Sequence, residues 1–146
     1  MYEKSREAYH TIANELAIRI LPVGDAFWLA GQHRKFRFQG DDKFSYEAPP
    51  ARQVPDEKYS LHTGYFWGGE EGKEFRFDSH HANTAGKFLG SLVWYGVMFE
   101  ASPAKVKFVP EGISSDFAKH LTDEDREYIR SVFDRRKRAA KYADGI

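Results

Sequence analysis

The chain has 146 residues, with 22 Lys and Arg against 22 Asp and Glu, and it contains no Cys. This length suits a single domain with a sizeable core. The balanced charge argues against a protein that binds nucleic acid through a general basic field. The absence of Cys excludes disulfides, cysteine-based zinc sites and cysteine nucleophiles.

Membrane insertion and export leave recognisable apolar segments, and this sequence has none long enough to span a bilayer. The longest apolar run, Leu92 to Phe99, has eight residues, whereas a spanning helix needs about 20. The first residues are charged and lack the apolar core of a signal peptide. We expect no membrane partner. The compartment stays open: it is the cytoplasm if Met1 is the natural start, and export is compatible with a longer parent protein.

The first third of the chain predicts two helices and a strand. Tyr9, Ile12 and Leu16 have the spacing of an amphipathic helix, predicted over residues 3–17. The alternation of apolar residues over 18–22 predicts a short strand that ends at a proline. Asp25 is a candidate N-cap for a second helix, which would extend to Ala30.

Residues 31–77 form a long, loop-rich insertion, dense in Gly, Pro and charged residues. Short extended pieces are expected at Lys35–Phe38 and Glu74–Phe77. Loops of this length without regular structure are uncommon in compact domains. The many aromatic residues of this insertion indicate that it packs against the rest of the protein.

The remainder predicts helices around one short strand. Residues 84–99 are apolar over most of a helical surface, which is typical of a buried helix, and Thr84 is its candidate cap. A short strand is expected over 105–109 and a short helix over 115–120. Thr122 is expected to cap a last helix that reaches Lys141. The whole chain is thus predicted to be one α/β domain, with three or four helices and few short strands.

The residues most suggestive of chemistry are Asp78 and His81, directly before the helix of residues 84–99. At this spacing a carboxylate can accept the imidazole Nδ1 proton and stabilise the imidazolium, which leaves Nε2 free as a general base. The spacing also occurs by chance. The alternative is that Asp78 and Thr84 are turn and cap residues beside a surface histidine.

The residues around this pair carry a resemblance to a known family. The segment Asp78-Ser79-His80-His81-Ala82-Asn83-Thr84-Ala85-Gly86-Lys87-Phe88-Leu89, which leads into Val93-Trp94-Tyr95, resembles the final conserved block of SGNH (GDSL-type) hydrolases. The segment from Ile20 to Phe27 looks like the strand and loop before that block, and the helix at 3–17 looks like the helix before that strand.

This resemblance implies a partial three-layer, flavodoxin-like α/β sandwich, equivalent to the C-terminal half of an SGNH hydrolase. It implies ester hydrolysis, with acylated carbohydrates among the substrates. It makes His81 the general base and Asp78 the carboxylate that orients it, and it gives His80 no role.

One part of the family pattern is missing, because no serine of this chain follows Gly-Asp. The family uses a Gly-Asp-Ser nucleophile, together with a Gly and an Asn that help to form the oxyanion hole. Nucleophile, base and oxyanion donors act as a unit. Three explanations stay open: a truncated product, a partner polypeptide that supplies the first half, or a non-catalytic binding or assembly module that forms a homo-oligomer or a partner complex.

Other residues offer weaker alternatives for chemistry. Ser79 adjoins the pair but shares its turn, which disfavours it as the nucleophile. His62, Asp78, His80 and His81 are ligand types that zinc accepts, but adjacent histidines rarely point to one ion. We therefore expect neither a metal nor a cofactor.

Two further segments have both a functional and a structural interpretation. Three aromatic residues between glycines at 64–69 suit stacking on a sugar ring, but a plug that covers either the edge left by the missing half or the core is favoured. The basic run Arg135–Arg138 suits phosphate contacts. Its place near the end of a predicted helix favours helix-dipole complementation instead, and no nucleic acid is expected.

Overall fold

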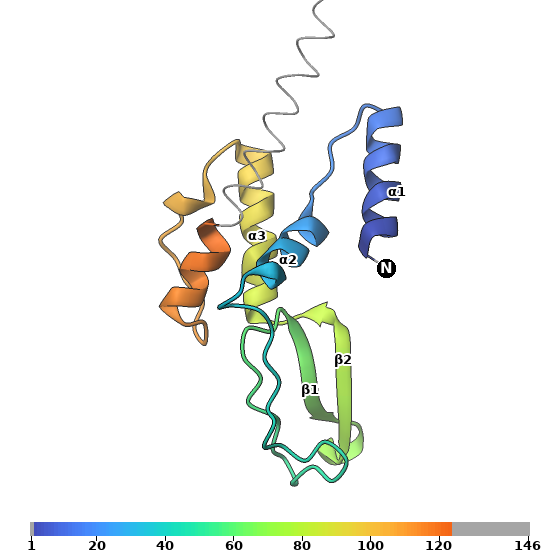
Figure 1. Ribbon diagram of the computed structural model, residues 1–146, viewed down its shortest axis with the longest axis vertical. Coiled ribbons are helices and arrows are strands. Elements are labelled where there is room, and N and C mark those ends of the chain that lie inside the picture. The colour runs from blue at the N-terminus through green and yellow to red at the C-terminus, as the bar shows by residue number, and fades with distance from the viewer. Residues whose placement is uncertain (1, 124–146) are drawn as a thin grey trace, which may run out of the picture.

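The computed structural model describes residues 2–123 and confirms a mixed α/β protein with four helices and one two-stranded antiparallel sheet (Figure 1). A fourth helix begins at residue 115 and continues to residue 123, the last that is described. The expected helix up to Lys141 and the basic run at 135–138 lie outside the described residues. In chain order the bounded elements are α1 (Tyr2–Glu15), α2 (Val23–Gln32), β1 (His62–Gly68), a 3₁₀ turn (Glu70–Gly72), β2 (Glu74–Ala82), α3 (Thr84–Phe99) and a second 3₁₀ turn (Pro103–Lys105).

The core surrounds α3, which lies between α2 and the segment after residue 100 (Figure 1). Leu89 and Val93 of α3 are fully buried, as is Leu121 of the helix that begins at 115. Phe88, Leu89, Leu92 and Val93 of the apolar surface predicted for residues 84–99 do face the interior, whereas Phe99 at its end is 72% exposed. The other buried members are Ala26, Ala30, Phe36, Leu61, Ala85, Phe88, Leu92, Val97, Phe117 and Ala118.

The start of α3 is fixed by Asn83, one residue before the cap predicted at Thr84. The Asn83 side-chain oxygen accepts a hydrogen bond from the Gly86 N–H at 3.0 Å. Its side-chain amide donates to the carbonyl oxygen of Ser60 at 2.8 Å. Asn83 thus satisfies a free N–H of the first turn and also ties the helix to the chain before β1.

Strands β1 and β2 form a hairpin in which Tyr65 faces Phe77 and Trp67 faces Phe75. Both strands therefore place aromatic side chains on one face. The register shifts between His62 and Gly64, and Gly64 takes a φ of +70°, a conformation that favours glycine. The extended piece expected at Glu74–Phe77 is confirmed as the first half of β2. Residues 62–68 were expected to be irregular, and this prediction is wrong because they form β1.

The loop before β1 packs along the hairpin (Figure 1). The Phe44 ring stacks on Phe75 at a centroid distance of 5.8 Å. The indole N–H of Trp67 donates to the Gln53 carbonyl oxygen at 2.6 Å. The insertion is therefore packed, as its aromatic content predicted. The extended piece expected at Lys35–Phe38 is wrong, because its residues form turns before a single bridge that joins Gln39 to Lys58.

Two other predicted strands do not form. Residues 18–22 belong to no sheet among the described residues, because no described strand lies beside them. Alternation alone predicted a strand there, but a strand also needs a partner. Residues 106–109 are likewise irregular after the turn that begins at Pro103.

Two predicted caps are also wrong. Asp25 lies inside the first turn of α2, where it is buried, and Pro22 is the residue before that helix. Thr122 lies within a helix that is continuous from 115, and its hydroxyl donates to the Ala118 carbonyl oxygen at 2.7 Å. A Thr hydroxyl can bond either a free N–H at a helix start or a carbonyl one turn earlier, so its presence did not fix a boundary.

Helix α1 ends where its prediction placed the end, within two residues. Ala17 takes a left-handed φ of 49°, and the Ile18 N–H donates back to the Ala13 carbonyl oxygen at 3.0 Å. This bond pattern terminates the helix. None of the helices in the described part of the chain is both long and apolar enough to cross a membrane.

Candidate active site

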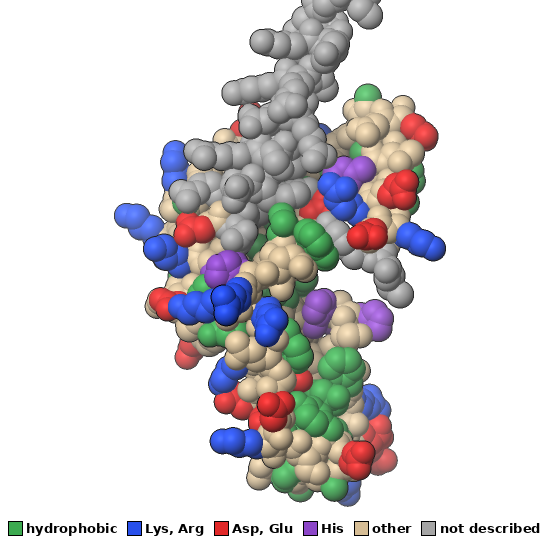
Figure 2. Space-filling view, in the orientation of Figure 1, with side chains coloured by type: hydrophobic (Ala, Val, Ile, Leu, Met, Phe, Trp, Pro, Cys, Tyr) green, Lys and Arg blue, Asp and Glu red, His purple; other side chains and the backbone are tan. Residues whose placement is uncertain are grey.

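The predicted pair lies where the hairpin joins the helical part of the molecule. Asp78 and His81 lie in the second half of β2, and α3 begins three residues after His81. Histidine side chains gather on the surface at this end of the hairpin (Figure 2). The pair therefore lies at the end of β2 that is tied to the core through the capped start of α3.

Asp78 and His81 contact one another directly. The Oδ2 atom of Asp78 lies 2.7 Å from Nδ1 of His81. The other oxygen, Oδ1, accepts the backbone N–H groups of His80 at 2.8 Å and of His81 at 2.9 Å. The carboxylate thus closes a local turn of its own strand and also reaches the imidazole.

The charge of Asp78 is well stabilised by these contacts. The backbone N–H of His81, followed by that of His80, lowers the pKa of Asp78 to about 2, and the His81 side chain adds to this effect. The carboxylate is therefore ionised near neutral pH and only accepts hydrogen bonds. It follows that Nδ1 of His81 donates the proton, so that in the neutral imidazole Nε2 carries the lone pair.

The free side of His81 is open to solvent. The His81 side chain is 84% exposed, compared with 22% for Asp78. No hydrogen bond joins Nε2 to any other residue of the described chain. The backbone is held from the neighbouring strand, because the Thr63 hydroxyl donates to the His81 carbonyl oxygen at 3.1 Å. The pair has the geometry of a base and its orienting carboxylate, with the reactive nitrogen accessible.

The other predicted candidates have different contacts. The Ser79 hydroxyl is 3.4 Å from Nδ1 of His80. The His62 ring meets the edge of Phe27. Within residues 2–123, no three His, Asp or Glu side chains are grouped so that they could hold a metal ion.

The glycine-flanked aromatics of β1 are largely occupied with one another. Tyr65 stacks on Phe75 at a centroid distance of 5.0 Å and also contacts Tyr46 and Phe77. Trp67 donates its indole N–H to the loop before β1. These aromatic residues thus pack on β2 and on the loop before β1, and none of them belongs to the buried core of the described residues. Phe77 of β2 keeps an exposed ring.

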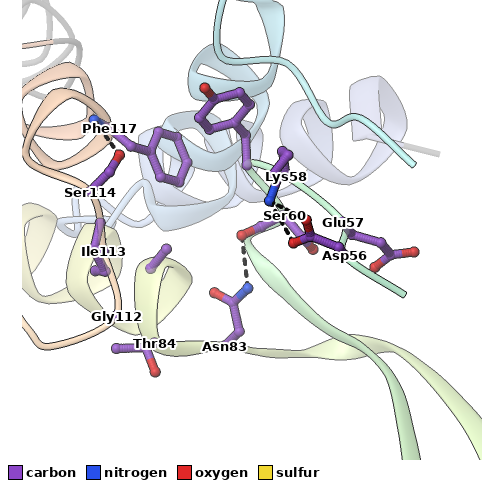
Figure 3. A pocket seen from close by; sticks show the side chains of 12 residues that line it. Asp56, Glu57, Lys58, Ser60, Asn83, Thr84, Gly112, Ile113, Ser114 and Phe117 are labelled. Atoms are coloured by element: carbon purple, nitrogen blue, oxygen red, sulfur yellow. Dashed lines mark hydrogen bonds and ion pairs between the residues drawn. The ribbon is translucent and has the colours of Figure 1, made fainter. Parts of the chain in front are cut away.

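A cleft of about 470 Å³ adjoins the start of α3 (Figure 3). The residues that line it are Asp56, Glu57, Lys58, Tyr59, Ser60, Asn83, Thr84, Ala85, Gly112, Ile113, Ser114 and Phe117. Burial raises the pKa of Glu57 in its wall.

The sequence did not single out this cleft, because its walls come from three segments far apart along the chain. Asn83 alone had a local signal, since Asn before an apolar helix is a common N-cap. Asn83 also links the cleft to the pair, being two residues beyond His81. The cleft therefore offers hydroxyl, amide and carboxylate groups next to the segment that holds His81.

Searches against protein-family models, curated proteins and solved structures found no match for this chain.

Proposed function

We propose that Asp78 and His81 are the orienting carboxylate and the general base of a serine esterase site, whose nucleophile comes from another polypeptide segment. The observation that carries this proposal is the 2.7 Å contact between Asp78 Oδ2 and His81 Nδ1, with Nε2 exposed. This is the arrangement that a hydroxyl nucleophile requires of its base.

In this proposal Nε2 of His81 accepts one proton and then donates it in each of the two halves of the reaction. Nε2 takes the proton of the serine hydroxyl as the serine oxygen attacks the ester carbonyl carbon. It then gives that proton to the departing alcohol as the acyl-enzyme forms. Water then attacks the acyl carbon as Nε2 takes its proton, and Nε2 gives that proton to the serine oxygen as the acyl–serine bond breaks and the carboxylic acid leaves. Asp78 stays ionised throughout, because its low pKa keeps it from accepting the imidazole proton.

The resemblance to SGNH hydrolases supports the same assignment and suggests the wider fold. On this proposal the chain is the C-terminal part of a three-layer sandwich. The cleft beside Asn83 suits a hydroxyl-rich substrate, because its lining mixes Ser, Thr, Asn and carboxylate groups with two aromatic rings. An acylated carbohydrate fits this description.

The experiment adds the N-terminal half of an SGNH hydrolase, ending before its own Asp-x-x-His block, to the full chain and measures p-nitrophenyl acetate hydrolysis. We expect activity that neither part shows alone. His81→Ala should lower it by about 10³-fold or more. His80→Ala is the matched control. His80 is also exposed, but its imidazole ring makes no bond to the Asp78 side chain. Equal activity in the two variants would refute the assignment.

A second candidate function is a non-catalytic assembly module. It is favoured by the apolar side chains that α1 leaves exposed. It predicts a homo-oligomer or a stable complex without hydrolysis. Light scattering that shows a monomer, together with no binding in a glycan screen, would contradict this candidate.

A further inference from the structure

A groove of about 370 Å³ runs along one side of α3, where the chain that follows this helix turns back beside it (Figure 1). Its volume lies within the range of small-molecule sites, about 300–1,000 Å³. The wall formed by α3 consists of Thr84, Lys87, Phe88, Ser91, Leu92 and Tyr95. Among these, only Thr84 also lines the cleft beside Asn83. The groove is therefore a separate site from that cleft.

The groove is long and narrow. Its residues on α3 recur every three or four positions, so they form a single stripe along the helix. At the helical rise, the stripe from Thr84 to Tyr95 is about 16 Å long. Val106, Phe108 and Pro110 are alternate residues of the returning chain and form the opposite wall. The small volume, spread over that length, suits an unbranched chain better than a ring system.

The lining is apolar except for one charged side chain. Phe88 and Leu92 are buried members of the core and form the floor, whereas Phe108 on the opposite wall is 70% exposed. Lys87 is the charged residue of the lining, and no Asp or Glu contributes to it. The Lys87 ammonium makes no ion pair with any residue of the described chain. The groove thus combines apolar walls with an uncompensated positive charge.

The polar groups of the groove lie toward one end. Thr84 and Lys87 belong to the first turn of α3, where they bring a hydroxyl and the ammonium. The hydroxyl of Ser91, one turn further, already donates to the Lys87 carbonyl oxygen at 2.8 Å. At the far end the Tyr95 ring packs on Phe99 at a centroid distance of 5.6 Å. A ligand that matches this order has an anionic head and an apolar tail.

We propose that this groove binds an unbranched aliphatic carboxylate. The carboxylate lies at Thr84 and Lys87, and the alkyl chain follows Phe88 and Leu92 toward Tyr95. An extended peptide would bring an N–H and a C=O group at every residue against walls that offer few partners, whereas an alkyl chain brings none. A cationic amphiphile would place its charge against Lys87. This site goes beyond the proposed function and does not depend on it, because His81 takes no part in the binding.

The first test adds hexanoate, octanoate and decanoate to the full isotope-labelled chain and follows the amide signals by NMR. We expect shifts confined to residues 84–95 and 106–110. The affinity should rise by about fourfold for each added methylene, because each one leaves water for the apolar walls. 1-Octanol has the tail without the charge and should bind more weakly than octanoate. Equal affinity for the three acids, or shifts outside these two segments, would overturn the proposal.

The second test removes the charge at the head of the groove. Lys87→Gln keeps most of the side-chain length, and it should lower the ratio of octanoate to 1-octanol affinity at least fivefold. Lys119→Gln is the matched control, because Lys119 is also exposed but does not line the groove. The same ratio in both variants would show that Lys87 does not hold the carboxylate.

The third test fills the groove. Ser91→Trp adds a large ring at an exposed position of the α3 wall and should weaken octanoate binding at least tenfold. Met98→Trp is its control, because Met98 is 57% exposed on the same helix but lies outside the groove. Circular dichroism checks that both variants fold. If octanoate binds both equally well, the acid does not occupy this groove.

Other occupants give different results in the same experiments. A doubled mass without octanoate shifts shows that a second copy fills the groove. Nuclear Overhauser contacts in the free monomer between Phe108 and residues outside 2–123 show that the chain fills its own groove. Either result overturns the proposal. Octanoate binding in a protein that fails to hydrolyse esters supports the groove and counts against the proposed function alone.

Discussion

Helices α1 and α3 have the same kind of apolar spacing but very different surroundings. On α3, Leu89 and Val93 are completely buried among α2, the chain before β1 and the helix that begins at 115. On α1, Leu16 and Tyr9 face outward, and Arg6 and His10 make the contact with α2. Periodicity thus identifies a helix face that needs a partner, but it does not identify the partner. On α3 that partner is in the chain, whereas on α1 Tyr9, Ile12 and Leu16 stay exposed in the described structure.

The largest expected difference between the two helices is in core truncation. Leu89→Ala should lower the free energy of unfolding by about 2–5 kcal/mol, because it leaves a cavity in packed surroundings. Leu16→Ala should change it by less than about 0.5 kcal/mol, as an exposed substitution does. Denaturant unfolding of the two variants measures both values. Similar losses would show that α1 is packed as tightly as α3.

A second comparison stays within α3 and concerns its close contact with the chain before β1. A Cβ on Gly86 would meet the Leu61 carbonyl oxygen at 2.1 Å, whereas a Cβ on Gly90 would be 3.7 Å from Val23. Gly86→Ala should therefore cost about 1–3 kcal/mol from overpacking. Gly90→Ala should stabilise the protein by about 0.5–1 kcal/mol through helix propensity. Thermal unfolding distinguishes the opposite signs.

The cap of α3 gives a smaller effect. Asn83→Ala should cost about 1 kcal/mol, because it removes the acceptor for the Gly86 N–H. Thr84→Ala is the matched control and should be close to neutral, since the structure assigns the cap to Asn83. If chemical denaturation ranks the two the other way, the helix begins one residue later than described.

The smallest expected effect is a titration at the candidate site. Backbone N–H donors from His81 and His80 lower the pKa of Asp78 to about 2, below its ordinary 3.8. The folded state therefore favours the ionised carboxylate. Its contribution to stability is present above about pH 4 and is lost as the pH falls toward 2. A side-chain carboxyl ¹³C titration should have its midpoint near 2, and His81→Ala should raise it slightly. A midpoint near 3.8 would mean that the local turn is not formed.

The sequence predicted the contact between Asp78 and His81 better than it predicted the sheet. The spacing of Asp78 and His81 predicted a carboxylate–imidazole contact, which the structure forms at 2.7 Å. That contact is local, so three residues of backbone are sufficient to make it. The cleft beside Asn83 was missed because its walls are distant along the chain. The strands expected at 18–22 and 105–109 were wrong because alternating residues do not supply hydrogen-bonding neighbours.

The sequence by itself determined the local features of this protein: α1, α3 and the Asp78–His81 turn. Each depends on residues within one or two turns of chain, where spacing and hydrogen-bonding groups act directly. The tertiary structure decided which segments cover α3, that the hairpin is the one sheet of the described residues, and that Tyr9, Ile12 and Leu16 of α1 stay exposed. These three features depend on which surfaces contact one another. A single segment of the sequence contains only one of the two surfaces that are buried in such a contact.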